Sequence, residues 1–359
     1  LLKKRYGKHQ NGKMVNSRRA NMIIKEQVKA LWKLCFEDSE EFVEMYFKLR
    51  YKNEVNVAIQ SGDEVISALQ MLPYPMTFCG ETVQTSYISG ACTHPDFRSK
   101  GVMRELLSQS FARMLRNGVQ FSTLIPADPW LFDYYKRMGY ATVFQYSVKE
   151  MTLPEFIPSK EIAVNAVSEP QDEVYSYLNK KLSERPCCIQ HSAEDFQIVM
   201  ADLPISRGNL FVARQANEIR GVAIIYKGEN SIIINELPAE DKDTEYSLLF
   251  AIKQYTGCNH IIQLLPPDKE LPQHSLGMAR IINVKEVLQI YASAFPEDDM
   301  QLEVSDTQLS VNNGYYYLSD GKCRYSTERL PGAHIQMNIS ELTERILKKL
   351  NPYMSLMLN

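Results

Sequence analysis

The chain has 359 residues, more than one ordinary hydrophobic core accommodates, so we expect two or three domains of roughly 150 residues each. Hydrophobic residues make up 45% and charged residues 23% of the sequence, which excludes a largely disordered chain, a coiled coil and a collagen-like fibre. No window of about 18 residues is apolar throughout, so neither a membrane-spanning helix nor a membrane partner is predicted.

The net charge of −3 is unevenly distributed along the chain. Residues 1–21 contain seven Lys and Arg residues and no acid, so this segment carries +7 and the rest of the chain −10. A basic segment without apolar periodicity is typical of disorder, and we predict a disordered tail there. The mildly acidic remainder argues against nucleic acid as a partner.

The seven cysteines form no Cys-x-x-Cys pair, and the adjacent Cys187 and Cys188 do not match the spacing of zinc ligands. The histidines are scattered, so the sequence predicts no metal site. An odd number of cysteines in a long chain favours reduced thiols, and with them a cytoplasmic location, over a disulfide framework.

In the first part of the chain, apolar residues recur at helical spacing between Glu26 and Tyr51, and Asp38-Ser39 interrupts them, which predicts two helices. The following alternation and turn residues predict, in chain order, strands over 55–60, 65–73 and 81–93, a helix over 101–116, a strand over 121–125, a helix over 131–138 and a strand over 140–149. This order is typical of a layered α/β domain.

Pro154, Pro158 and Pro170 separate this part from a second one that repeats its order. We expect a helix over 172–182, strands over 210–214, 221–226 and 231–237, a helix over 242–256 and a strand over 261–265. The second part is therefore interpreted as a degenerate copy of the first.

From about residue 283 the pattern changes to that of a small third α+β unit. It predicts a helix over 284–295, strands over 300–304, 307–311, 315–318 and 322–326, and a closing helix over 340–350 with Ser340 as its N-cap. The predicted organisation is a tail over 1–21 and domains over 22–150, 151–282 and 283–359.

The densest chemical signal is the run from Thr93 to Met103, where an apolar strand ends, a short loop turns and a helix begins. A helix N-terminus offers unpaired N–H groups and the positive end of its dipole, which suits a pyrophosphate. Gly101 permits close approach of a ligand to the backbone, and Arg98 and Lys100 add positive charge. Taken alone, Arg-x-x-Gly is a weak signal, because it also fits ordinary surface residues before a helix.

The run from Thr93 to Met103 resembles the coenzyme A loop of the GNAT superfamily of N-acetyltransferases, and residues 135–140, Tyr-Lys-Arg-Met-Gly-Tyr, resemble the aromatic helix-to-strand signature of that family. The order of three domains is similar to that of the enhanced intracellular survival (Eis) acetyltransferases, whose third domain is sterol-carrier-like. Segments 280–284, 302–306 and 312–315 resemble that third domain. The resemblance implies tandem GNAT folds, each a mixed central sheet flanked by helices, plus a small C-terminal α+β sterol-carrier-like domain.

The resemblance also implies which residues bind acetyl-CoA. The strand backbone would lie beside the pantetheine arm and the loop would surround the pyrophosphate, and the residues concerned are Ala91, Cys92, Thr93, Arg98, Ser99, Lys100, Gly101, Val102, Met103 and Arg104. Met103 departs from the family, which often has a small residue there, but backbone donors survive that change. The corresponding turn of the second part, 236–242, has no Arg-x-x-Gly and contains three acids, so we expect only the first copy to bind the cofactor.

Two residues are candidates for catalysis. Tyr135 occupies the general-acid position of the family, and a tyrosine, with a reference pKa of about 10, can donate a proton to a departing thiolate. A half-buried packing role is the alternative for Tyr135, and Tyr134 is its local competitor. Residues 352–359 are apolar for a chain end, so we expect them to be docked. The resemblance gives the terminal carboxylate of Asn359 a part in amine deprotonation, and a tail that only packs the third domain is the alternative.

The sequence therefore predicts a cytoplasmic acetyl-CoA-dependent N-acetyltransferase that acetylates a primary amine of a cationic small molecule or peptide by direct attack, without a metal. The resemblance adds a homo-oligomer. The competing interpretation is a non-catalytic protein that senses acyl-CoA or binds an apolar ligand in its third domain.

Overall fold

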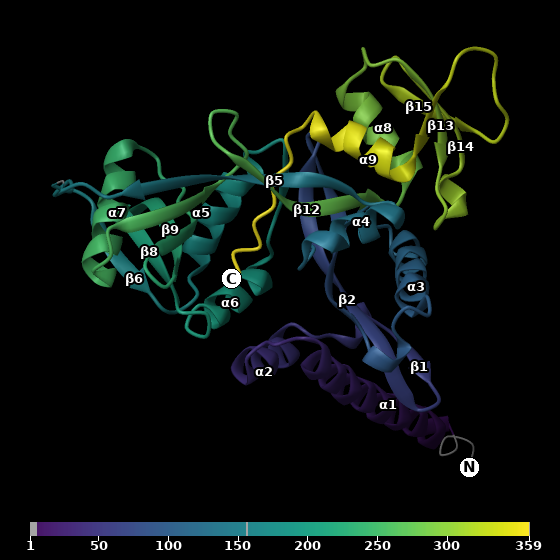
Figure 1. Ribbon diagram of the computed structural model, residues 1–359, viewed down its shortest axis with the longest axis horizontal. Coiled ribbons are helices and arrows are strands. Elements are labelled where there is room, and N and C mark those ends of the chain that lie inside the picture. The colour runs from purple at the N-terminus through teal and green to yellow at the C-terminus, as the bar shows by residue number, and fades with distance from the viewer. Residues whose placement is uncertain (1–5, 156, 359) are drawn as a thin grey trace. The chain divides into compact units, whose positions relative to one another are not determined.

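The computed structural model describes residues 6–155 and 157–358 (Figure 1). The chain divides into two compact units, one of Leu1–Leu72 and Tyr87–Arg113 and one of Pro73–Ser86 and Met114–Asn359. This division does not coincide with the predicted boundaries near residues 150 and 282, because the long strands β2 (Glu64–Phe78) and β3 (Glu81–Thr93) each contribute to both units. The predicted domain boundaries therefore stay a prediction.

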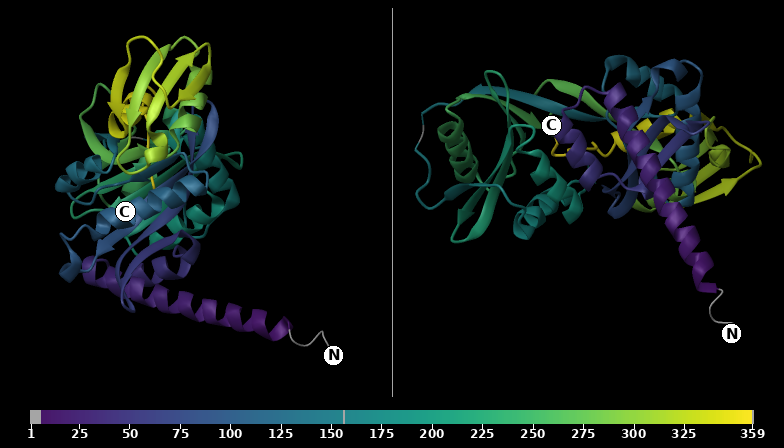
Figure 2. Two further views of the ribbon diagram at one scale, coloured as in Figure 1. Left: turned by 90° about the vertical axis from the view of Figure 1, so that its right-hand side faces the viewer. Right: turned by 90° about the horizontal axis from the view of Figure 1, so that it is seen from below.

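In the first unit, α1 (Tyr6–Cys35) and α2 (Glu40–Leu49) form the predicted helix pair, seen together in Figure 2. The predicted break is confirmed, since Ser39 is the N-cap of α2 and accepts a hydrogen bond from the Phe42 N–H at 3.2 Å. Trp32 packs against the Tyr46 ring with centroids 4.6 Å apart, which joins the two helices through a buried aromatic cluster.

The N-terminal end of α1 differs from the prediction. The helix begins at Tyr6, so the disorder predicted for the basic segment is wrong over residues 6–21, whereas residues 1–5 lie outside the described residues. Once the packed turn at Val28 and Trp32 has formed, each further residue adds one backbone hydrogen bond without a new nucleation cost. Residues 6–21 contain two Lys and two Arg, which are good helix formers, but also three Asn and two Gly, which are poor ones.

The strands of the first unit follow the prediction closely. β1 (Asn56–Ser61) pairs antiparallel with β2, from Asn56↔Gln70 to Ser61↔Glu64, and β2 is followed by β3 in the sheet order. Within β3, Gly90 has a φ of 60°, and a Cβ there would collide with the Trp32 ring. After β3 come a short 3₁₀ turn, Pro95–Phe97, and α3 (Val102–Arg116).

The second unit contains a mixed sheet in the order β4-β12-β5-β11-β10-β9-β8-β6 (Figure 1). Its strands are β4 (Phe121–Leu124), β5 (Ala141–Thr152), β6 (Ala163–Val167), β8 (Gly208–Gln215), β9 (Glu218–Lys227), β10 (Ile232–Glu236), β11 (His260–Leu265) and β12 (Gln273–Ile281). β12 pairs antiparallel with both β4 and β5, and β5 pairs on its other edge with β11. The two halves of the chain therefore share one sheet, with the last strand of the second half between two strands of the first.

Helices cover this sheet and enclose two apolar clusters. Their bounds are α4 (Pro129–Arg137), α5 (Asp172–Ser183), α6 (Ala193–Asp202) and α7 (Lys242–Thr256), and a short strand β7 (Cys187–Ile189) pairs with the end of β2. Leu248 and Ile252 of α7 pack into one cluster with Phe211 of β8. Leu178 and Phe196 of α5 and α6 pack into the other. This α/β arrangement confirms the predicted fold class.

The C-terminal part forms a separate sheet, in the order β15-β14-β13-β16, with two helices. Its elements are α8 (Val284–Ala294), β13 (Met300–Ser305), β14 (Gly314–Ser319), β15 (Lys322–Ser326), β16 (Ile335–Asn338) and α9 (Ile339–Lys348). The strand predicted over 307–311 is wrong, because Asp306 accepts hydrogen bonds from the N–H groups of Gln308 and Leu309 and turns the chain. β16, which was not predicted, pairs with β13 instead.

The predicted cap of the last helix is also wrong. Asn338 is the N-cap of α9 and forms a capping box with Glu341. Ser340, the predicted cap, lies inside the helix and donates a hydrogen bond to the Tyr140 carbonyl at 2.7 Å. That bond ties α9 to the residue before β5.

Candidate active site

The loop after β3 has the open backbone that the sequence predicted. The His94 N–H donates to the Ile66 carbonyl at 2.8 Å, which fixes the start of the loop on β2. Ser99 and Gly101 then adopt left-handed backbone conformations, with φ of 60° and 80°. No atom lies within 4 Å of the position that a Cβ on Gly101 would occupy, so the backbone faces open space.

The main-chain N–H groups of residues 99–104 are the central feature of this loop. None of them donates to an acceptor among the described residues, and the first such bond of the helix runs from the Glu105 N–H to the Gly101 carbonyl at 3.1 Å. Val102 and Met103 are half-buried, whereas Ser99, Lys100 and Arg104 are exposed. A run of free amides at the positive end of a helix is suited to an anion such as a phosphate.

The two cations of the loop are held by the loop itself. Arg98 donates from Nε to the Thr93 carbonyl at 3.0 Å and from its terminal nitrogen to the Cys35 sulfur at 3.7 Å. Lys100 donates to the Asp96 carbonyl at 2.8 Å and lies over the Phe97 ring. Both side chains therefore stabilise the conformation of the loop. The main-chain N–H groups of residues 99–104 stay without an acceptor among the described residues.

The end of β3 is braced from β2. Ser67 donates a hydrogen bond to the Cys92 carbonyl at 2.9 Å, and its hydroxyl lies 2.8 Å from that of Thr93. Cys92 and Thr93 are buried, whereas Ala91 is half-buried. The backbone that was predicted to line a pantetheine arm is thus held in place before the loop begins.

Tyr135 belongs to the second unit, near the end of α4. Its ring makes edge contacts with the rings of Tyr134 and Tyr140 at centroid distances of 5.4 and 5.6 Å. Burial raises the pKa of Tyr135 to about 12, with a smaller contribution from Tyr134. Its hydroxyl has no hydrogen-bond partner among the described residues, whereas the Tyr140 hydroxyl lies 2.7 Å from that of Ser122. The side chain is therefore packed, protonated at neutral pH, and has a free donor.

A buried ion pair that the sequence did not predict supports the turn after α4. Arg280 of β12 donates to both oxygens of Asp306, at 2.7 and 2.9 Å, and both side chains are fully buried. Gly139 has a φ of 92°, and a Cβ there would collide with the Arg280 guanidinium. Only glycine fits at position 139, because the side chain of Arg280, more than a hundred residues away in the sequence, fills the space of a Cβ.

The C-terminal tail is docked, as predicted, and Tyr353 and Met357 bind residues of the second half of the chain. Tyr353 bridges in parallel to Cys188 of β7, and its hydroxyl donates to the buried Glu236 carboxylate at 3.3 Å. Tyr226 donates to the Met357 carbonyl at 2.8 Å. Asn359, the predicted catalytic terminus, lies outside the described residues.

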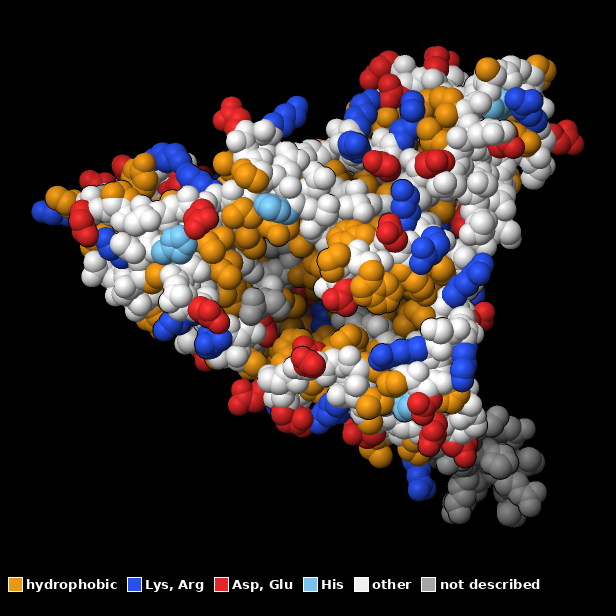
Figure 3. All heavy atoms as spheres, viewed as in Figure 1, with side chains coloured by type: hydrophobic (Ala, Val, Ile, Leu, Met, Phe, Trp, Pro, Cys, Tyr) orange, Lys and Arg blue, Asp and Glu red, His pale blue; other side chains and the backbone are white. Residues whose placement is uncertain are grey.

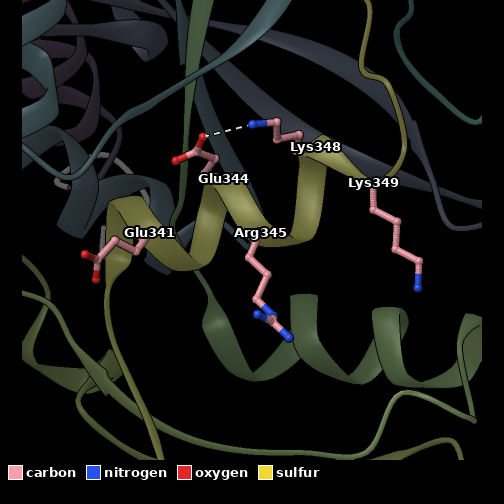
Figure 4. A pocket seen from close by; sticks show the side chains of 5 residues that line it. All are labelled: Glu341, Glu344, Arg345, Lys348 and Lys349. Atoms are coloured by element: carbon pink, nitrogen blue, oxygen red, sulfur yellow. Dashed lines mark ion pairs between the residues drawn. The ribbon is translucent and has the colours of Figure 1, made fainter.

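Two further pockets lie elsewhere in the second unit. One, of about 450 Å³, is an open charged groove along α9 in which Lys348 pairs with Glu344 at 3.6 Å (Figure 4). The other, of about 650 Å³, lies in the second half and is largely apolar, with Arg207 and Lys227 among its lining residues. Neither pocket includes Tyr135.

The face of the molecule shown in Figure 3 carries no extended basic patch. On the face shown in Figure 3, basic and acidic side chains are interspersed with apolar ones. In the described part of the chain, no helix is long and apolar enough to cross a membrane. Among the same residues, no group of three or more His, Cys, Asp or Glu side chains could hold a metal ion.

Solved structures establish the class of fold. The chain is similar to a GCN5-related N-acetyltransferase from Anabaena variabilis, at 17% identity and a TM-score of 0.72, over 92% of this chain and 96% of that one. It is similar to a probable N-acyltransferase from Enterococcus faecalis, at 15% identity and a TM-score of 0.70, over 89% and 86%. It is also similar to Eis1 from Mycobacterium abscessus, at 12% identity and a TM-score of 0.69, over 90% and 86%. The fold is thus GNAT-like over most of the chain.

A family model matches the first part of the chain. Residues 17–143 match the family described as acetyltransferase (GNAT) domain. This span contains both the loop after β3 and Tyr135, and it supports acyl-CoA-dependent acetyl transfer in general. No curated protein matches the chain.

Proposed function

We propose that the protein is an acetyl-CoA-dependent N-acetyltransferase that acetylates a primary amine of a cationic small molecule or peptide. The observation that carries this proposal is the run of unoccupied amides over residues 99–104, at the start of α3 and within the span that matches the GNAT domain.

In this proposal the amides of residues 99–104 bind the pyrophosphate, and the backbone of Ala91, Cys92 and Thr93 holds the pantetheine arm. Arg98 acts mainly by fixing the loop, since its guanidinium contacts Thr93 and Cys35. In the same proposal the acceptor amine belongs to a cationic molecule, and the net acidic charge of residues 22–359 favours this choice.

The proposed reaction is a direct transfer. The neutral amine attacks the thioester carbonyl carbon, the carbon–sulfur bond breaks, and the departing sulfur receives the proton of the Tyr135 hydroxyl, while the amine loses one proton to a base. Tyr135 suits this role because its hydroxyl has no partner among the described residues and its raised pKa keeps it protonated. We assign the base to the terminal carboxylate of Asn359.

Three finer assignments belong to the same proposal. The C-terminal sheet with α8 and α9 is a sterol-carrier-like domain, the second half does not bind acetyl-CoA, and the protein assembles as a homo-oligomer in the cytoplasm. The open anion site in the first half favours an enzyme over a protein that only carries an apolar ligand.

Titration calorimetry with acetyl-CoA, followed by turnover assays on a panel of amines, tests the proposal. We expect one acetyl-CoA per chain and acetylated product from at least one cationic amine. Tyr135→Phe should lower kcat by at least about 100-fold with little change in acetyl-CoA affinity, and Tyr134→Phe is the matched control. Absence of acetyl-CoA binding would overturn the proposal. Equal loss of affinity and kcat in Tyr135→Phe would make that residue structural.

A further inference from the structure

Two thiols lie side by side where α1 meets the end of β3. Cys35 is the last residue of α1 and is half-buried, whereas Cys92 is buried in the cluster beneath it. The two thiols shift each other's pKa, and the Cys35 sulfur lies 3.6 Å from the carbonyl oxygen of Thr93, the residue that follows Cys92. The Arg98 guanidinium lies 3.7 Å from the same sulfur. The Cys35 sulfur thus has a second thiol and a fixed cation as neighbours.

This environment stabilises Cys35 as a thiolate. The hydrogen bond from Cys92 is the largest cause that lowers the pKa of Cys35 to about 6, Arg98 and His94 lower it further, and burial opposes them. The Thr93 carbonyl, 3.6 Å away, suits a protonated thiol, but it also accepts from Arg98 Nε at 3.0 Å. The combined effect of Cys92 and of the Arg98 cation therefore outweighs that of one shared acceptor.

Other thiols of the chain lack such support. Burial raises the pKa of Cys79, Cys187, Cys188 and Cys323, so each stays protonated at neutral pH. Because the thiolate is the nucleophilic form, these four thiols should react slowly. Cys35 combines thiolate character with partial exposure.

We propose that Cys35 is a site of oxidation by hydroperoxides and that Cys92 resolves it as a Cys35–Cys92 disulfide. In the first step the Cys35 thiolate attacks one peroxide oxygen, the O–O bond breaks, and a sulfenic acid and hydroxide form. In the second step Cys92 attacks the sulfenic sulfur and releases water. The two sulfurs lose two electrons in total, and the hydroperoxide, the named oxidant, is reduced.

Cys92 becomes competent only after the first step. Its pKa is raised chiefly by its hydrogen bond with Cys35, with burial and the charge of the Cys35 thiolate adding to the effect. Conversion of the thiolate into a neutral sulfenic acid removes that repulsion, which makes the second thiol easier to deprotonate. The same conversion deprives Arg98 of an anionic neighbour at the start of the loop after β3.

Peptide mapping of the reduced full-length chain after brief treatment with stoichiometric hydrogen peroxide at pH 7.4 tests the proposal. We expect a Cys35–Cys92 cross-link and loss of two hydrogens. Cys92→Ala should instead accumulate a sulfenic acid at Cys35 that dimedone traps, and Cys35→Ser should abolish the rapid phase. Cys323→Ser is the matched control and should leave the cross-link unchanged.

The rate of alkylation by iodoacetamide gives a second readout. It is measured on the unaltered chain, so it does not depend on whether a cysteine variant folds. Alkylation of Cys35 in the unaltered chain should rise with a midpoint near pH 6 and proceed at least about 10-fold faster at pH 7 than that of Cys323. First oxidation at another cysteine, or a Cys35 no faster than Cys323, would overturn the proposal. A disulfide between Cys35 and a cysteine other than Cys92 would overturn the assignment of the resolving thiol.

Discussion

The chain contains two turns with the same order of strand, loop and helix, and they differ in what occupies the start of the helix. In the first, between β3 and α3, the amides of residues 99–104 have no acceptor among the described residues. In the second, between β10 and α7, Asp241 accepts from the Thr244 N–H at 2.8 Å and from the Thr244 hydroxyl at 2.7 Å. One helix end is open to an anion, and the other already holds a carboxylate.

The rest of the second turn is equally closed. Its backbone is pinned to β9, since the Val222 N–H donates to the Pro238 carbonyl at 3.0 Å and the Glu240 N–H to the Arg220 carbonyl at 2.8 Å. The Thr244 hydrogen bonds, followed by that from Arg220, lower the pKa of Asp241 to about 2. Two of the three acids that suggested repulsion of a phosphate are paired with cations, Asp241 with Arg220 at 2.8 Å and Glu240 with Lys181 at 2.9 Å. The two turns therefore differ mainly in whether a carboxylate already accepts from the N–H groups at the helix start, and less in their net charge.

The strand ends preceding the two turns also differ. Thr93 is braced by Ser67 and leads into the open loop. Glu236, its counterpart, is buried and binds the C-terminal tail through Tyr353 and Ser355. The strand end of the second half thus anchors the C-terminal tail of its own chain. A repeated fold can keep its architecture while only one copy keeps unsatisfied donors for function.

The largest expected effect concerns Glu236. Burial raises the pKa of this carboxyl from 4.5 to about 7, and hydrogen bonds from Ser355 and Tyr353 and the charge of Arg185 only partly offset that. Below pH 4.5 the carboxyl is neutral in the folded and unfolded chain alike, so its stabilising contribution is fully present. As the pH rises to 7 the unfolded chain ionises first, and we expect a loss of up to about 3 kcal/mol.

Unfolding of the parent chain and Glu236→Gln at several pH values checks this expectation. The midpoint of the parent chain should fall between pH 4.5 and 7 relative to that of the variant, and the difference should be constant above pH 7. Glu344→Gln, at an exposed carboxylate of α9, should not alter the parent profile. Parallel profiles for the parent chain and Glu236→Gln would contradict the assignment.

The second prediction concerns a variant that introduces a carboxylate at the start of α3, where the amides of residues 99–104 have no acceptor among the described residues. Gly101→Asp should place a carboxylate beside the free amides of residues 99–104, on a left-handed backbone (φ 80°) that differs from the extended backbone of Asp241 (φ −154°). We expect acetyl-CoA affinity to fall about 100-fold, or about 2.7 kcal/mol, because the charge and the lost donors both oppose a phosphate. Gly101→Asn tolerates the same left-handed φ without the charge and should lose less. Calorimetric affinities that are equal for the two variants would refute the role of the carboxylate.

Local signals account for the elements that the sequence predicted. Both ends of β3 and of α7 agree with the prediction, because turn residues and caps stand directly beside them: Gly80 precedes β3, and Asp241 and Gly257 flank α7. β12 was missed, because its first half, with Gln273, His274 and Ser275, is polar and exposed. Its place between β4 and β5 follows from pairing with strands far away in sequence, which no local pattern contains.

The candidate site shows the same limit. The loop could be predicted because Gly101 and the strand–loop–helix order are local features. The contacts of Arg98 with Cys35 and of Gly139 with Arg280 join residues 63 and 141 positions apart, and only the folded chain reveals them. The docked tail was predicted from its apolar residues, but its partner was not, since Glu236 and Tyr226 lie in a half that looked merely degenerate.

The smallest expected effect tests whether the closed turn can be reopened. Asp241→Ala removes the cap of α7, and we expect the unfolding midpoint to fall by a few degrees. Acetyl-CoA should still bind with a stoichiometry of one per chain, because the second loop stays pinned to β9 and none of its residues from Leu237 to Asp241 has a left-handed φ. Asp241→Asn, which retains a capping oxygen, is the control and should lose less stability. A second acetyl-CoA bound to Asp241→Ala in calorimetry would mean that the cap alone keeps the second turn closed, and that the backbone path of the loop contributes nothing to the difference between the two copies.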